Sequence, residues 1–142
     1  MCVSAWESYI EELIRESLRL LQPLGPIMGA WPALNAYVLG LLGRFHTPSQ
    51  ANVEQLIRNS LGLPDIHLFW RWQNQTPVQV VQRLTQSLEY RHEIAHGVNP
   101  RPTVHHQYAT ELPDFILRIA ECTDSAVRNH LVNVDLIPAP WP

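Results

Sequence analysis

The stretch TPVQVVQRLTQSLEYRHEIAHG, residues 76–97, decides the fold because it carries a complete set of signals for one amphipathic helix. Thr76 and Gln79 form the pattern of a capping box, and Pro77 stands at the first helical position, where proline is favourable. Gly97 has the freedom to adopt the left-handed conformation that ends many helices. We therefore expect one helix that begins after Thr76 and ends at His96 and Gly97.

One face of this predicted helix is apolar and the other is polar. The apolar seam consists of Val81, Leu84, Leu88 and Ala95. The same spacing places Arg91 on the seam, and an Arg at a core-facing position needs a partner. Glu89 and Glu93 fall on the opposite face, which we expect to be solvated.

Helical spacing recurs along the rest of the chain, whereas the alternation typical of strands does not. Ser4 and Glu7 predict a capping box for a first helix, and Thr47 predicts the N-cap of a third. The further predicted helices cover residues 4–21, about 32–44, 48–61 and roughly 110–131. The aromatic segment Asp65–Trp72 is expected to form a satellite cluster beside the main core.

These segments predict an all-α fold, which we interpret as an up-and-down bundle of about five helices. Residues 1–135 are expected to form a single domain. The Pro-rich residues 136–142 are expected to form an irregular C-terminal tail.

Charge and composition exclude several classes of protein. The formal charge of −3 excludes a uniformly basic nucleic-acid binder, so any contact with a polyanion must come from a local patch. Two isolated cysteines are too few for a disulfide framework or a thiolate metal site, which favours a cytoplasmic setting. Residues 20–43 lack charge, but prolines and glycines interrupt them, so we expect a loop and a buried helix rather than a membrane span.

The octapeptide YRHEIAHG, residues 90–97, matches two motifs of different chemistry. The first is His-Glu-x-x-His, the zinc-binding helix of a metallopeptidase, in which His92 and His96 bind the ion and Glu93 acts as the general base. The second is Arg-x4-His, formed by Arg91 and His96, which is the catalytic pair of a metal-independent ribonuclease. The choice between the two motifs determines the function.

The zinc motif lacks its expected surroundings. Asn99 and Pro102 stand where the extended motif has Gly and His, which leaves Glu121 as a candidate third ligand. Arg91 would repel a cation, and Glu93 falls on the polar side of the helix. We therefore expect no metal and no cofactor, and keep the metallopeptidase as a second alternative.

The ribonuclease motif is common by chance, but its context is specific. Residues 63–97, LPDIHLFWRWQNQTPVQVVQRLTQSLEYRHEIAHG, closely resemble the RiboL-PSP branch of the HEPN superfamily, with its Leu-Pro-Asp, Trp-x-Trp and Ile-Ala-His-Gly patterns. Residues 3–13 and 115–131 are also similar to this branch. The chain departs from the family in two ways: Met1 stands close to a helix that another usually precedes, and no Tyr follows the motif His.

The resemblance implies a HEPN-like helical bundle that forms homodimers and cleaves RNA without metal, in toxin–antitoxin, antiviral-defence or RNA-processing settings. It implies Arg91, His92 and His96 as catalytic residues, and an antitoxin or other regulatory protein as a further partner. Additional RNA-binding residues are expected at Arg83, Arg101, His105 and His106. The alternatives are a catalytically inactive HEPN dimer that binds RNA or protein, and a purely structural role for the motif.

Helix geometry gives a separate reason to expect a dimer. Arg91 and His96 are about 140° apart around a straight helix, so they do not point at the same atom. Two chains packed through their Arg91-bearing faces would bring each Arg to the other chain's His in a composite cleft.

Overall fold

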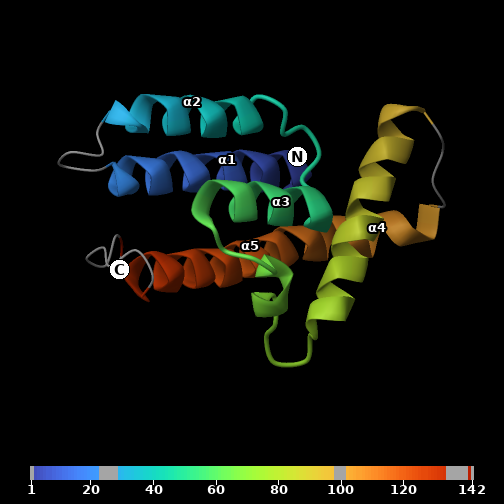
Figure 1. Cartoon of the computed structure of the whole chain (residues 1–142). Helices are drawn as coiled ribbons and strands as arrows, with labels where there is room; N and C mark the ends of the chain where they lie inside the picture. Colours follow the sequence, from blue (N-terminus) through green and yellow to red (C-terminus); the bar gives the residue numbers. More distant parts are fainter. Residues whose placement is uncertain (1, 23–28, 98–101, 134–140, 142) are drawn as a thin grey trace.

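The computed structural model shows, in the residues that it describes, a bundle of five α-helices and a short 3-10 helix (Figure 1). Those residues are 2–22, 29–97, 102–133 and 141, and side chains are not described for 102–108. The α-helices are α1 (Cys2–Leu21), α2 (Trp31–Leu42), α3 (Gln50–Leu61), α4 (Pro77–Ala95) and α5 (Pro102–Asn133), with the 3-10 helix η2 at Ile66–Phe69. The predicted all-α bundle of about five helices is confirmed.

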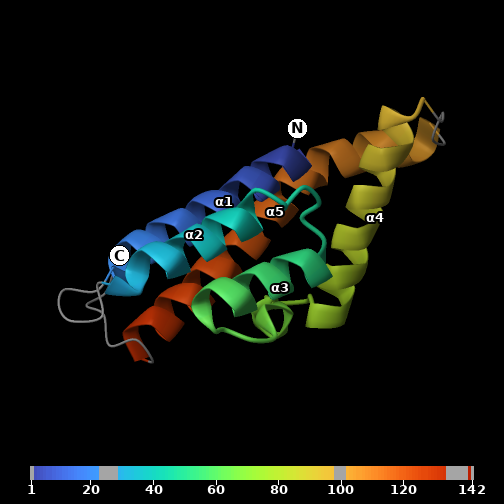
Figure 2. The same ribbon diagram turned by 45° about the horizontal axis from the view of Figure 1, so that its top comes forward.

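The axes of four helices lie roughly along one line, and the axis of the fifth crosses them. Helices α1, α2, α3 and α5 run along the long axis of the molecule, while α4 stands across one end of this layer (Figures 1 and 2). Only part of α4 therefore packs on the body, which matters for the candidate site below. None of the described helices combines the length and the apolar character needed to cross a membrane.

Two tryptophans connect the elements of the core. Trp6 of α1 and Trp70, just after η2, are fully buried, and their rings meet edge to face with centroids 6.0 Å apart. The Trp6 indole donates to the carbonyl oxygen of Pro48, and the Trp70 indole donates to Thr123 Oγ1 of α5 at 2.9 Å. The aromatic segment was predicted as a satellite cluster, but Trp70 belongs to the main core because α1, η2 and α5 converge on it.

The helix boundaries show where local signals decide and where they do not. The capping box at Thr76 is confirmed, since Thr76 Oγ1 accepts from Gln79 N and the Gln79 side chain accepts from Thr76 N. The capping box at Ser4 is wrong because α1 already begins at Cys2. The cap of α3 is Ser49 rather than Thr47, with Ser49 Oγ accepting from the backbone N–H of Asn52 at 3.3 Å.

Helix α5 is longer than predicted. It begins at Pro102, whose missing N–H is not needed in a first turn, and it continues through Pro113. Of the predicted tail, residues 136–140 and 142 lie outside the described residues. Trp141 is anchored to α5, because its indole donates to Asp124 Oδ2 at 2.7 Å and its carbonyl oxygen accepts from Arg128.

Candidate functional site

The C-terminal half of α4 extends beyond the hydrophobic core. Val80, Leu84 and Ser87 are the buried residues of α4, and all three lie before its last two turns. This end of α4 points away from the four-helix layer (Figures 1 and 2). Arg91 and His92 are exposed, as is His96 directly after the helix. The three predicted catalytic residues are thus all exposed at this end of α4.

Arg91 was predicted on the buried seam of α4, but the structure leaves it exposed because the core ends before this turn. It continues the spacing of Leu84 and Ser87, yet its side chain is 45% exposed. Its partner is Glu7 of α1, with 3.5 Å between Arg91 Nη1 and Glu7 Oε2. The side chain of Glu7 is only 19% exposed. This ion pair answers the need for a partner and connects the first turns of α1 to the end of α4.

The seam of α4 differs from the predicted one in its phase and its length. Val80 and Ser87 are buried, whereas the predicted Val81 and Leu88 are only partly buried against the core. Ala95, the predicted end of the seam, is exposed. The seam ends early because α4 crosses the layer instead of lying along it.

His92 and His96 lie against each other at the end of α4. Their ring centroids are 4.2 Å apart and their planes are inclined by 58°. His96 is the C-cap residue, and Gly97 follows with φ at +68°, which ends the helix as predicted.

One chain does not bring all three motif residues together. The described contact of Arg91 is with Glu7, and the two histidines contact each other. Arg91 and His96 diverge by about 140° around the helix, so within one chain they do not point at the same atom.

The set of ligands that a zinc peptidase requires is incomplete in the described part of the chain. No group of three His, Cys, Asp or Glu side chains there is arranged to hold a metal ion. Glu121, the candidate third ligand, instead pairs with Arg118 on α5 at 3.1 Å. Glu93 was expected to be solvated but is half-buried. The histidine pair therefore lacks a third ligand from these residues of the same chain.

Arg83, a predicted RNA-binding residue, links α4 to α5. Its guanidinium contacts Glu111 Oε2 at 2.8 Å and lies over the Phe115 ring, 4.7 Å from the centroid. It also lines a shallow depression of about 300 Å³ shared with Trp72 and Arg118. A guanidinium held by a carboxylate and a ring is already engaged, which favours a structural role for Arg83.

The other predicted RNA-binding residues are not located. Arg101 lies outside the described residues, and His105 and His106 lie in α5 among the positions whose side chains are not described. Their role remains a prediction.

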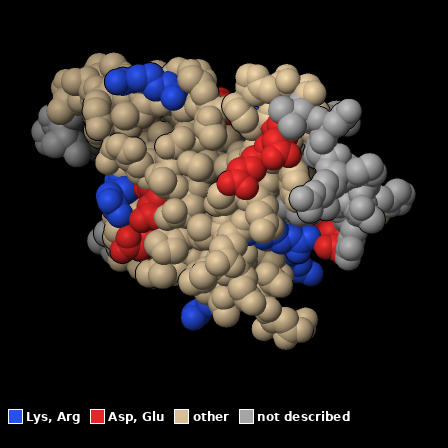
Figure 3. Space-filling model, turned by 90° about the vertical axis from the view of Figure 1, so that its right-hand side faces the viewer, with Lys and Arg blue, Asp and Glu red and all other residues tan. Residues whose placement is uncertain are grey.

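The surface around α4 carries separated charges. Figure 3 views this side, where acidic side chains gather over the upper part of α4 and arginines lie lower down. Glu89 is exposed on the same part of the helix as His92. The described surface beside the two histidines therefore carries carboxylates next to the exposed guanidinium of Arg91, and it is not the basic patch that RNA binding by one chain would require.

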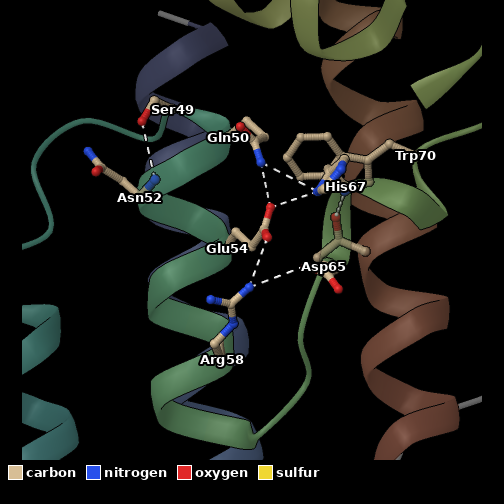
Figure 4. Close-up of polar contacts among 9 residues, drawn as sticks. Ser49, Gln50, Asn52, Glu54, Arg58, Asp65, His67 and Trp70 are labelled. Carbon is tan, nitrogen blue, oxygen red and sulfur yellow. Dashed lines mark hydrogen bonds and ion pairs between the residues drawn. The ribbon is translucent and has the colours of Figure 1, made fainter. Parts of the chain in front are cut away.

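Sequence reasoning missed a second polar cluster, centred on Glu54 of α3 (Figure 4). His67 Nδ1 lies 2.7 Å from Glu54 Oε2, and Arg58 Nη2 lies 3.1 Å from the other carboxylate oxygen. Gln50 donates to the same carboxylate, and Arg58 also reaches Asp65 at 3.2 Å. These contacts fasten η2 to α3. Gln50, Glu54 and Arg58 follow one another four residues apart on α3, a spacing that is visible in the sequence, but no spacing rule predicts the contact with His67, which comes from another element.

Known proteins provide no further assignment: no protein-family model, no curated protein and no solved structure matches this chain.

Proposed function

We propose that this protein is a metal-independent endoribonuclease of the HEPN type that acts as a homodimer. The observation that carries the proposal is the joint exposure of Arg91, His92 and His96 on the half of α4 that no core covers. The resemblance of residues 63–97 to the RiboL-PSP branch supports the same assignment. A cytoplasmic setting and a regulatory protein partner belong to this proposal.

The dimer accounts for the exposed apolar surface beside the motif. Ile94 is 60% exposed and, like Ala95, lies within about 60° of Arg91 around the helix. A second chain that packs on this end of α4 buries Ile94 and brings its own Arg91, His92 and His96 beside those of the first chain, so that both chains line one cleft.

The chemistry follows from the residue types. The RNA 2′-hydroxyl attacks the adjacent phosphorus, its proton passes to His96 as general base, and the bond from phosphorus to the 5′-oxygen breaks. A protonated imidazole, His92 or the other chain's His96, gives a proton to the departing 5′-oxygen. The products are a 2′,3′-cyclic phosphate and a 5′-hydroxyl. Arg91 leaves Glu7 to hold the phosphate and oppose the charge that develops there.

Incubation of the purified protein with mixed RNA in excess chelator tests this proposal. Cleavage with 2′,3′-cyclic phosphate ends is expected, and His96→Ala should reduce the rate about 10²–10⁴-fold, the range for loss of a general acid or base. Arg91→Ala should also abolish cleavage. His46→Ala, an exposed histidine between α2 and α3, is the matched control and should retain activity.

Other outcomes identify the alternatives. RNA or protein binding without cleavage supports the inactive HEPN dimer, and chelator-sensitive peptide hydrolysis supports the metallopeptidase. A solution mass of a monomer at the working concentration contradicts the composite cleft.

A further inference from the structure

We propose that His92 and His96 form a two-imidazole binding site for a divalent transition-metal ion of the zinc and copper class, and that the bound ion blocks RNA cleavage. Metal binding stands on the geometry of one chain. The block on cleavage rests on the proposed function.

The histidine pair has the geometry of a helical chelate. The two residues are one helical turn apart, and the 4.2 Å between ring centroids places both rings over the same patch of surface. The 58° between the planes means that the rings are not stacked face to face, so a nitrogen from each can reach one ion by a small rotation. Neutral imidazole is a preferred ligand of Zn²⁺ and Cu²⁺, and it is the commonest metal ligand in proteins.

Two carboxylates flank the pair, and Arg91, the neighbouring cation that would oppose a metal ion, is paired with Glu7 of α1. Glu89 and Glu93 stand three residues before His92 and His96 respectively, a spacing that places side chains on neighbouring parts of a helix. Figure 3 shows acidic side chains over this part of α4. Neither carboxylate completes a three-ligand site in the described residues, so water fills the remaining coordination positions of the ion. Such a site binds the ion more weakly than a structural zinc site does, and the binding is reversible.

The same imidazoles cannot serve the ion and the RNA together. A ligating imidazole nitrogen has no lone pair left to accept the proton of a 2′-hydroxyl. Occupation by Zn²⁺ therefore removes His96 as a base and His92 as a proton donor. A two-ligand site of this kind does not hydrolyse peptides, which separates this proposal from the metallopeptidase.

Calorimetric titration of the full chain with ZnCl₂ near neutral pH tests the binding. We expect His92→Ala and His96→Ala each to weaken Zn²⁺ binding tenfold or more, because the second imidazole adds at high effective concentration. Alanine favours helix, so both variants should keep their circular dichroism spectrum. The controls are His46→Ala and a double variant with His105→Ala and His106→Ala, which should bind as the wild type does. Equal affinity in wild type and His92→Ala, or a loss confined to the double variant, overturns the site.

Cleavage of RNA by the wild type with and without Zn²⁺ tests the block. We expect the rate to fall with the same midpoint as the binding curve and to recover when chelator is added. Binding without any loss of cleavage overturns the block and leaves the site. Absence of cleavage in chelator overturns the proposed function and with it the block, while the titration still decides the site.

Discussion

Replacement of Thr123 by valine is expected to destabilise the fold through a single unsatisfied donor. Thr123 is fully buried. Its Oγ1 accepts a hydrogen bond from the Trp70 indole at 2.9 Å and donates one to the Ile119 carbonyl oxygen. Valine has nearly the same shape, so Thr123→Val creates no cavity but leaves the Trp70 N–H without an acceptor. A buried donor without a partner costs about 1–3 kcal/mol.

Thr85→Val is the matched control for this prediction. Thr85 makes the same bond to the carbonyl four residues earlier, at 2.9 Å from Val81 O, but it is exposed and accepts from no indole. We expect this change to stay within about 0.5 kcal/mol. Urea unfolding should show the lower midpoint for Thr123→Val alone, with an unchanged slope.

A double-mutant cycle with Trp70→Phe isolates the bond. With the indole donor absent, Thr123→Val should cost at least about 1 kcal/mol less than it does in the wild type. Equal losses for Thr123→Val and Thr85→Val, or no coupling in the cycle, would refute the argument that this bond stabilises the core.

Three more predictions concern helix caps, pH and the cluster of Figure 4. Ser49→Ala should lower the free energy of unfolding by about 1 kcal/mol and Thr47→Ala by much less, since Ser49 provides the cap; urea midpoints decide this. Burial, and then a nearby carboxylate, raise the pKa of Tyr9 well above its usual value of about 10. The unfolded chain then loses this proton first, so the stability should fall by about 1.4 kcal/mol per pH unit above pH ~10, and Tyr9→Phe should remove that slope in unfolding curves measured against pH. Glu54→Ala should cost about 1–2 kcal/mol and Arg58→Ala, which is 52% exposed, under about 1 kcal/mol; a larger loss for Arg58→Ala would contradict the central position of Glu54.

Much of the fold could be predicted because its strongest signals are local. Thr76 and Gln79 satisfy each other within one turn, and Gly97 ends the helix through its own backbone, so α4 was predicted with its cap and its end. Ser4 and Glu7 show the same pattern but do not form a cap, because packing extends α1 to Cys2. Local patterns are satisfied only where the tertiary structure leaves them available.

The candidate site could be predicted only in part for the same reason. The contact of His92 with His96 follows from their spacing on one helix. The partner of Arg91 does not, because Glu7 stands 84 positions away in the sequence. The spacing predicted a seam through Val81 and Leu88, whereas Val80 and Ser87 are the buried positions, and it contains no information on how far the core extends along α4.

The early end of the core along α4 has a consequence for hydrogen exchange. Backbone amides in the last two turns are held by helical hydrogen bonds and the ion pair of Arg91, with little buried apolar surface above them. Local opening there should need much less free energy than global unfolding, so these amides should exchange faster than those near Leu84. Docking of a second chain would slow them. The last two turns of α4, which carry the motif, are thus the part of the helix that a docked chain would stabilise most.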